Sequence, residues 1–591
     1  MELLGRSVFP TVGEMPYLLT LQAHSFFWFD LLPAAQEDPA LQAAPPEFLT
    51  LVMPHGWSDL FREHNLPQLE NDAVPAFLPR QRWFGEKDQR IKTTSVRTRG
   101  EIVRQFEDGS GSESFLAQVV DAQLAGGNRA RYFLPLAAIW SPAETDLRQA
   151  LAPVTLAELR QFRKEGALVD AISQDGLALA VIDAINREAT IPLEGGEIRC
   201  RKTPIFSDAR VPERFAVRRI GAEQSNSSVF FEEYGMLKLY RRLQAGPHPE
   251  IEMSRFLVES AGFANTPPLL ATLAIAIDGE SGKEEHALGV LFGFVRNQGD
   301  GWTQALNYLG RYLDDALISG GGGPSALADP DVFFLMLARQ LGIRTAEMHR
   351  ALAEHGDDNP DFVPEPVGPE DIVEWRDDLA GAAAQMLSQL ESERASLSTQ
   401  TRDLADRVLA LRHELFERIL RLIPDTVEAQ KTRYHGDFHL GQVIVVQNDF
   451  FIIDFEGEPA RPLALRRRKS SPLRDVAGMI RSFDYATVAA VRHLTEARPA
   501  AEPKMTQLAE AWRQRAVDGF RAAYRKTMRG CAAYPANKKQ AREMTAFFIL
   551  EKAIYEVSYE LANRPAWVDI PLKGILGILN RAERREHAAP A

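Results

Sequence analysis

Two apolar runs on either side of a short polar turn constrain the fold of this chain most strongly. The runs 443–446 and 450–453 flank a turn centred on Asn448, a pattern that predicts an antiparallel β-hairpin. Folding at Asn448 would set Gln442 directly opposite Asp454. Opposed side chains on one face of such a pair have Cβ atoms roughly 4.5–5.5 Å apart, so both could bind one small cation.

Asp437 lies on the polar segment that leads into this hairpin. A loop carboxylate, an amide and a second carboxylate therefore follow one another as Asp437, Gln442 and Asp454. Phosphoryl transfer from ATP uses a loop aspartate as the base, then an amide and a second aspartate as Mg²⁺ ligands, in that chain order. The segment predicts Asp437 as a catalytic base and Gln442 and Asp454 as magnesium ligands.

The sequence His-Gly-Asp-x-His-x-Gly-Gln at 435–442, followed by Ile-Asp-Phe-Glu at 453–456, resembles the aminoglycoside-phosphotransferase-like kinases. In that family Asn usually stands where this chain has Gln442. Together with the segments 223–228 and 456–462, this departure makes residues 76–575 similar to the maltokinases. The resemblance implies an α+β, bilobal protein-kinase-like fold with a β-rich N-terminal cap and a mainly helical C-lobe. It also implies ATP- and Mg²⁺-dependent phosphorylation of maltose at its anomeric hydroxyl, which gives maltose 1-phosphate and ADP and feeds α-glucan (glycogen) synthesis.

With 591 residues the chain is too long for one core, and five segments are expected. Residues 1–32 resemble the last hairpin of the β-domain that ends a trehalose synthase, an enzyme that occurs fused ahead of maltokinases. The alternative is an N-terminal arm that docks on the kinase. The remaining segments are an Ala/Pro-rich linker at 33–75, a β-rich cap at 76–172, a nucleotide-binding N-lobe at 173–297 and a helical C-lobe at 298–591.

Composition narrows the partners and the compartment. With 45% hydrophobic and 25% charged residues the chain is typical of soluble globular proteins, and no apolar run approaches the ~20 residues of a membrane helix. A net charge of −13 argues against a nucleic-acid partner. Cys200 and Cys531 are far apart and the first residues show no export signal, so a cytoplasmic protein is expected.

Three short strands are predicted between residues 215 and 240, and the last of them carries Lys238. Lys238 alternates with apolar neighbours, so its side chain should point away from their face of the strand. In a kinase-like lobe this lysine reaches the phosphates of ATP. A helix that begins at Pro249 carries two acids in its first turn. The family match favours Glu252 as the ion-pair partner of Lys238, with Glu250 as the alternative.

A polar segment ahead of the second strand is expected to bind the nucleotide. It stands where protein kinases carry a glycine-rich loop, and its amides and hydroxyls could hydrogen-bond to phosphate oxygens. The residues predicted to bind ATP there are Gln224, Ser225, Asn226, Ser227 and Ser228.

Residues that bind the acceptor are expected on several C-lobe segments. Tyr555 and Tyr559 lie one turn apart on a predicted helix, where they could stack on a sugar ring or form a core pair. The resemblance places Asp475 beside the active site, although it could also cap a helix. His439, with His435, is also expected to hold the catalytic loop through ring hydrogen bonds. The expected acceptor-binding residues are His439, Glu456, Arg461, Arg474, Asp475, Tyr555, Glu556, Tyr559, Arg564 and Trp567.

Two other functions are compatible with the same motifs. The first keeps the fold but phosphorylates another small sugar, an amino sugar or an aminoglycoside. The second is a non-catalytic kinase-like module that regulates a fused or associated trehalose synthase. Such modules usually lose the lysine, the base or the metal ligands, and this chain retains all of them, at 238, 437, 442 and 454.

Overall fold

The computed structural model describes residues 48–586 except 107, 108, 110, 141–149, 207–215, 220–225, 280, 281, 319–331, 357, 358 and 460. The chain divides into two units, which are described separately. The first comprises Met1–Phe77 and Ala138–Asp170, and the second Leu78–Ala137 and Ala171–Ala591. The expected hairpin at 1–32 and the start of the linker lie outside the described residues. No helix within the described ranges is long and apolar enough to cross a membrane.

The first unit contains a small sheet and short helical turns. Strand β1 (Thr50–Val52) pairs in parallel with β6 (Thr155–Gln161), which pairs antiparallel with β7 (Lys164–Asp170). Four short helical segments of this unit follow β1, namely η2 (Trp57–Phe61), α1 (Asn65–Gln68), η3 (Leu69–Ala73) and α2 (Val74–Phe77). Leu51, Leu60 and Leu69 are fully buried. The expectation of a linker is therefore wrong for residues 50–75, because their apolar side chains and the β1 backbone are engaged in this unit.

The front of the second unit is rich in β-structure, as expected for a cap. Its long central strand β3 (Ser112–Leu124) pairs antiparallel with β2 (Ile91–Gln105) and β4 (Arg129–Phe133). Strand β4 also meets the N-lobe through two backbone hydrogen bonds of 2.8 Å, one from Phe133 to Arg241 and one from Leu243 to Arg131. The cap strands are thus tied to the chain directly behind the strand that carries Lys238.

The N-lobe is one antiparallel sheet with the strand order β10-β11-β12-β14-β13-β9-β8. Its strands are β8 (Thr190–Leu193), β9 (Gly196–Lys202), β10 (Val217–Arg219), β11 (Asn226–Phe231), β12 (Gly235–Tyr240), β13 (Leu269–Gly279) and β14 (Gly282–Gly293). Helices α4 (Asp175–Asn186) and α5 (Pro249–Arg255) accompany the sheet. Strands β10 to β12 confirm the three strands predicted from alternation. Leu237 and Leu239 of β12 are buried, as that alternation requires.

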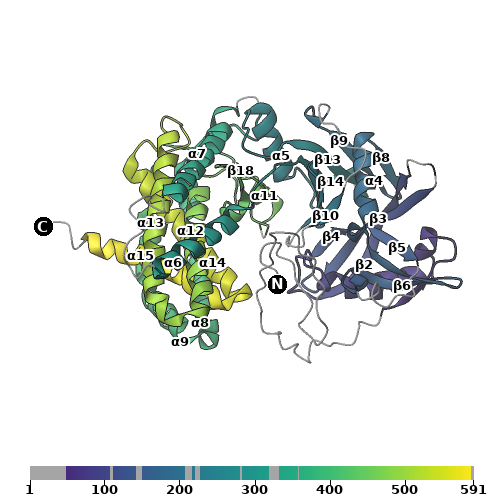
Figure 1. Ribbon diagram of the computed structural model, residues 1–591, viewed down its shortest axis with the longest axis horizontal. Coiled ribbons are helices and arrows are strands. Elements are labelled where there is room, and N and C mark those ends of the chain that lie inside the picture. Colours follow the sequence, from purple (N-terminus) through teal and green to yellow (C-terminus); the bar gives the residue numbers. More distant parts are fainter. Residues whose placement is uncertain are drawn as a thin grey trace, which may run out of the picture. The chain divides into compact units, whose positions relative to one another are not determined.

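The C-lobe is mainly helical and has one extensive apolar core. Its helices are α6 (Gly301–Ile318), α7 (Val332–Glu354), α8 (Pro369–Glu393), α9 (Thr399–Ala410), α10 (Arg412–Leu422), α11 (Leu463–Arg466), α12 (Leu473–Ala497), α13 (Glu502–Thr527), α14 (Lys538–Asn563) and α15 (Asp569–Glu586). Helix α13 packs on α7, and α12 packs on α13 and α14 (Figure 1). A Cβ atom on Gly342 of α7 would lie 2.3 Å from the carbonyl oxygen of Phe520, so this close helix contact requires glycine.

The hairpin predicted from the apolar runs is present, but its register differs by one residue. Strands β17 (Val443–Val446) and β18 (Asp449–Ile452) pair with Val446 opposite Asp449, which leaves a two-residue turn. Gln447 opens that turn with a φ of 56°. Gln442 consequently opposes Ile453, whose N–H donates to its carbonyl at 3.0 Å, and the expected opposition of Gln442 and Asp454 is wrong. Asp454 has a φ of 66°, and its carboxylate nevertheless accepts a 2.9 Å hydrogen bond from the Gln442 amide.

Candidate active site

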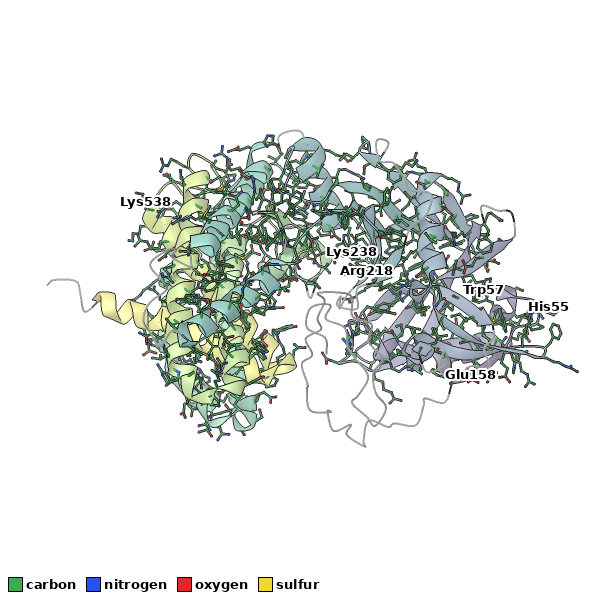
Figure 2. All side chains as sticks on the ribbon, viewed as in Figure 1. His55, Trp57, Glu158, Arg218, Lys238 and Lys538 are labelled. Carbon is green, nitrogen blue, oxygen red and sulfur yellow. The ribbon has the colours of Figure 1, made fainter. Side chains whose placement is uncertain are left out.

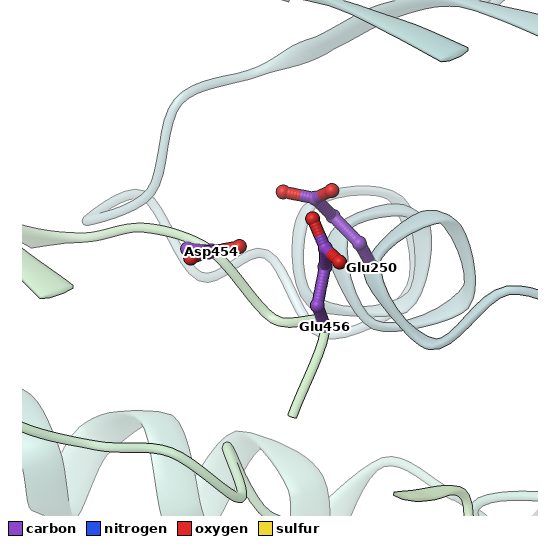
Figure 3. A group of neighbouring side chains, drawn as sticks. All are labelled: Glu250, Asp454 and Glu456. Carbon is purple, nitrogen blue, oxygen red and sulfur yellow. The ribbon is translucent and has the colours of Figure 1, made fainter. Parts of the chain in front are cut away.

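Lys238 of β12 gathers carboxylates from three places in the chain. Its Nζ lies 3.1 Å from Glu250 of α5, 2.7 Å from Asp454 and 2.5 Å from Glu456, both in the segment after β18. The lysine, labelled in Figure 2, is only 4% exposed. The three carboxylates point toward one another (Figure 3). We call these four residues the Lys238 cluster.

Glu250, and not Glu252, pairs with Lys238. The other oxygen of Glu250 accepts a 2.6 Å hydrogen bond from the Tyr240 hydroxyl, which holds the carboxylate toward the sheet. Glu252 instead lies 2.7 Å from Arg467. Residues two apart on a helix do not share a face, so only one of these acids can reach the lysine. The expected pairing of Lys238 with Glu252 is therefore wrong, and the alternative holds.

The Lys238 cluster has the charge and the donor atoms that suit a divalent cation. Three carboxylates and one ammonium give a formal charge of −2, and one oxygen from each acid lies within 4.8 Å of the others. Burial raises the pKa of Glu250 and of Glu456. Burial also opposes the charge of Asp454, but Lys238 outweighs it and lowers the pKa of that carboxyl overall. Carboxylate and amide oxygens are the ligands that Mg²⁺ prefers, so Asp454 with Gln442 beside it fits the metal.

The predicted nucleotide segment is described only in part. Gln224 and Ser225 lie outside the described residues. Asn226 donates a 2.5 Å hydrogen bond to Glu456. In the β11–β12 ladder Ser227 lies opposite Leu239 and Ser228 lies opposite Lys238. Glu456 is expected from the sequence to contact the acceptor. Its carboxylate instead lies beside Lys238, as that of Asp454 does, so Glu456 belongs to the Lys238 cluster.

Asp437 is an ionised carboxylate held beside a lysine that the motif does not contain. Its Oδ1 lies 3.4 Å from the Nζ of Lys552 on α14, and its side chain is 25% exposed. Burial would raise the pKa of Asp437, but the cationic side chain of Lys552 is the largest of several effects that lower it overall. Asp437 also lines a small cleft, so its carboxylate is accessible to an acceptor. Lys552 was missed from the sequence, although it lies three residues before Tyr555 on the same helix.

The catalytic loop is held by Asp475 and His435. Asp475 is 2% exposed, and its carboxylate accepts hydrogen bonds from the backbone N–H of His435 at 2.7 Å and of Gly436 at 3.0 Å. His349 of α7 lies 3.0 Å from the same carboxylate. The ring of His435 is bonded to the Ile453 carbonyl at 2.9 Å, which ties the loop to the hairpin. The carboxylate of Asp475 therefore holds the loop that carries Asp437 and does not cap its own helix.

A small cleft of about 50 Å³ lies against Asp437. Arg461, Arg474, Asp475 and Tyr555, all expected acceptor residues, are among those that line it, as are Glu458, Glu551 and Lys552. Arg461 lies 2.7 Å from Glu458, and Arg474 lies 2.6 Å from Glu551. Burial and the Glu458 carboxylate raise the pKa of Tyr555, so its hydroxyl is a neutral donor.

The other expected acceptor residues lie outside this lining. Tyr559 stacks on Tyr555 with ring centroids 6.2 Å apart and is 38% exposed. Trp567 stacks instead on Tyr485, and the Arg564 guanidinium lies between the Tyr559 and Trp567 rings in reach of both.

Two further expected residues are engaged elsewhere. Glu556 is buried and bound to Arg481 at 2.7 Å, so its carboxylate is not available to a ligand in the cleft. The Nδ1 of His439 accepts a 3.0 Å hydrogen bond from the Gly441 N–H, which makes this histidine a local cap near Asp437.

Two regions of the chain match known protein families. Residues 77–173 match the maltokinase N-terminal cap domain, and residues 216–457 match the phosphotransferase enzyme family. A glucosamine kinase from Mycolicibacterium smegmatis is 25% identical over 410 residues, which are 69% of this chain and 88% of that protein. A trehalose synthase from Pimelobacter sp. is 63% identical over only 30 residues, 5% of each chain.

The fold has a counterpart among solved structures. The structure of a glucosamine kinase in complex with glucosamine, ADP and inorganic phosphate has a TM-score of 0.54 and 20% sequence identity, over 89% of this chain and 100% of that one. The bilobal kinase-like fold expected from the sequence is thereby confirmed. The chain therefore contains one region similar to a maltokinase N-terminal cap domain and one similar to the phosphotransferase enzyme family, on a kinase-like fold.

Proposed function

We propose that this chain transfers the γ-phosphoryl group of ATP to the anomeric hydroxyl of maltose, giving maltose 1-phosphate and ADP. The observation that carries the proposal is the position of Asp437. It lines the small cleft and lies close enough to Asp454 for the charge of that carboxylate to act on its pKa. A base at that point can address a hydroxyl in the cleft while the phosphate donor lies at the Lys238 cluster. The match to the maltokinase cap supports maltose as the acceptor.

Each part of the site has a role in this proposal. Lys238 binds donor phosphates, and Asp454 with Gln442 holds Mg²⁺, with the polar segment 224–228 against the nucleotide. The metal, when bound, neutralises charge on the phosphates. Asp437 orients the acceptor hydroxyl and takes its proton as the oxygen bonds to phosphorus. The 30-residue likeness to a trehalose synthase supports fusion or association with such an enzyme, and hence a place in cytoplasmic α-glucan synthesis.

The lining of the cleft has four carboxylates and three cations. The fourth carboxylate, Asp475, is bound to the backbone at 435–436 and to His349, and the other charges balance, which favours a neutral acceptor. Each of three lining carboxylates already has a cationic partner, since Asp437 faces Lys552, Glu458 faces Arg461 and Glu551 faces Arg474. These paired side chains can form hydrogen bonds with sugar hydroxyls, and a neutral sugar leaves the charge of the cleft unchanged. An ammonium group would bind more favourably to a carboxylate that is not already paired with a cation.

An amino sugar is the second candidate acceptor, and one observation favours it. Within the described residues, Oε1 of the buried Glu458 has no hydrogen-bond partner. That oxygen could accept a hydrogen bond from an ammonium as readily as from a hydroxyl, and the M. smegmatis relative is a glucosamine kinase.

ADP release with Mg·ATP should separate these acceptors. We expect kcat/KM to be highest with maltose among maltose, glucose, glucosamine and an aminoglycoside, and we expect ³¹P NMR of the product to show an anomeric phosphate. A higher kcat/KM with glucosamine would transfer the proposal to the second candidate. Absence of turnover with every acceptor, in a folded preparation that binds ATP, would support the non-catalytic module.

Lys552→Met should move the acidic limb of the kcat/KM profile to higher pH by about one unit, the effect of one nearby opposite charge. Lys552 helps keep the pKa of Asp437 below its usual range, so the base stays ionised as the pH falls. Without the cation, Asp437 takes up its proton at a higher pH and activity is lost sooner on acidification. Lys539→Met, at an 81% exposed position on the same helix, is the matched control and should leave the limb in place. An unmoved limb in Lys552→Met would contradict this electrostatic role.

Tyr559→Ala should raise the KM for maltose roughly 2–10-fold, the equivalent of one lost stacking contact. The ring is 38% exposed beside the cleft residue Tyr555, so the melting temperature and the KM for ATP should hardly change. Trp567→Ala is the informative comparison, because that ring packs on Tyr485 and should cost stability without a selective maltose defect. If Tyr559→Ala lowers the melting temperature and leaves both KM values unchanged, this tyrosine pair is structural.

A further inference from the structure

A second cavity lies in the C-lobe, apart from the residues that line the acceptor cleft. It encloses about 510 Å³ and is lined by residues of α10, α12, α13, α14 and α15. Sites for small organic ligands commonly enclose ~300–1,000 Å³. None of the roles proposed above uses this cavity. We call it the helical cavity.

The helical cavity is basic in a chain that is acidic as a whole. Its lining holds six cations, namely Arg418, Arg481, Arg513, Arg521, Arg542 and Lys573. Against them stand three carboxylates, those of Asp484, Glu510 and Glu543. The lining therefore carries a formal charge of +3, whereas the whole chain carries −13. Such a local excess of positive charge attracts anions.

Two of these cations form no ion pair within the described part of the chain. Arg481 and Arg513 both bind Asp484, and Lys573 binds Asp569. Arg521 and Arg542, in contrast, form no ion pair or hydrogen bond with any residue in the described part of the chain. Burial lowers the pKa of Arg521 and the charges of Arg525 and Arg542 lower it further, while the charge of Asp518 only partly offsets them. Two neighbouring guanidinium groups that form no ion pair repel each other, so a shared anion would relieve both.

The rest of the lining is apolar. Ile480 of α12, Val517 of α13 and Ile549 of α14 face the same cavity. A wall of this kind suits the carbon skeleton of a ligand, and guanidinium groups bind phosphate through paired hydrogen bonds. We propose that the helical cavity binds an organic phosphate monoester, with its phosphate on Arg521 and Arg542 and its carbon skeleton on the apolar wall.

The helical cavity is connected to the acceptor cleft through one helix. Arg481, which lines the cavity, binds Glu556 of α14 at 2.7 Å. Glu556 adjoins Tyr555 of the cleft and lies one turn from Lys552, the partner of Asp437. An anion bound at Arg521 and Arg542 also attracts Arg481 in the same lining and weakens its bond to Glu556, so occupation of the cavity should change the KM for the acceptor. This consequence rests on the proposed function, whereas binding itself does not.

Calorimetric titration of the full chain tests the binding. Mg²⁺ and a non-hydrolysable ATP analogue are present throughout to fill the Lys238 cluster. Glucose 6-phosphate and AMP represent a sugar and a nucleotide source of the monoester, and inorganic phosphate and glucose represent the two halves of the ligand. We expect at least one monoester to bind, at least ~10-fold more tightly than inorganic phosphate, with no heat from glucose. Equal binding of inorganic phosphate and both monoesters would overturn the organic part of the proposal, and binding of none would overturn it entirely.

The double variant Arg521→Gln/Arg542→Gln locates the site. Its affinity for the monoester should fall at least ~10-fold, because both phosphate-binding groups are removed. Its melting temperature should change little, because the two side chains form no ion pair or hydrogen bond with the described residues. Arg311→Gln, at an exposed position on α6, removes one charge outside the cavity and should bind as the wild type does. Unchanged binding in the double variant would overturn the assignment.

The effect on the acceptor is read from initial rates with and without the bound monoester. We expect the KM for the acceptor to change at least ~2-fold in the wild type and not in the double variant. A bound monoester that leaves this KM unchanged would overturn the connection through Arg481. Failure to phosphorylate any acceptor would overturn the proposed function and leave the calorimetric result standing.

Discussion

Asp437→Asn is expected to reduce turnover by at least ~100-fold, the lower range for a positioned general base. The amide keeps the size of the side chain but cannot accept the proton of the acceptor hydroxyl. Nucleotide affinity should be nearly unchanged, because Asp437 lines the acceptor cleft and makes no contact with Lys238 among the described residues. Single-turnover rates with saturating ATP, measured beside nucleotide binding by calorimetry, give both quantities.

Asp425→Asn is the matched control for that variant. Asp425 lies in the same lobe with an 89% exposed side chain, so loss of its charge should leave turnover unchanged. Near-normal turnover in Asp437→Asn would show that Asp437 is not the general base. A parallel loss of ATP affinity would show that the carboxylate serves the nucleotide as well.

Asp454→Asn is expected to weaken metal-dependent nucleotide binding by at least ~10-fold, because it removes an anionic ligand from Mg²⁺. It also removes the carboxylate that lies 2.7 Å from Lys238 and changes the formal charge of the cluster from −2 to −1. More Mg²⁺ should restore part of the affinity. Nucleotide titrations at several Mg²⁺ concentrations measure the effect.

Asp449→Asn provides the comparison within the same hairpin. Asp449 binds Arg344 and Gln340, away from the Lys238 cluster, so its loss should not alter the Mg²⁺ requirement. If Asp454→Asn and the wild type respond identically to Mg²⁺, Asp454 is not a metal ligand. Asp437→Asn should also respond as the wild type does, which separates the base from the metal site.

Local patterns were sufficient for the elements and for most of the central site. Alternation of apolar and polar residues predicted the strands around Lys238, because successive side chains on a strand point to opposite faces. The motif order predicted that Asp437, Gln442 and Asp454 would approach one another, and Gln442 and Asp454 are hydrogen-bonded. The kinase-like fold followed from the same motifs and is confirmed.

Two wrong predictions, the partner of Lys238 and the register of the hairpin, arose where a shift of one or two residues changes the direction of a side chain. Glu250 and Glu252 are equally good first-turn acids, and only the orientation of α5 against β12 selects the one that meets Lys238. The hairpin turn contains two residues rather than three, so Gln442 opposes Ile453. A one-residue change in register reverses every side chain on a strand, and composition alone does not settle the length of a turn.

Residues distant in sequence completed the site in ways that no local pattern encodes. Lys552 meets Asp437 across 115 positions, and His349 meets Asp475 across 126. These contacts exist because α14 and α7 pack on the helical core that carries the catalytic loop. Because backbone geometry repeats locally, the spacing of apolar residues along a helix shows which of its faces is buried. The sequence therefore indicates that a core exists. Which charged groups then face each other, at Asp437 as at Arg521 and Arg542, depends on how the helices cross, and that is set by packing between segments far apart in the chain.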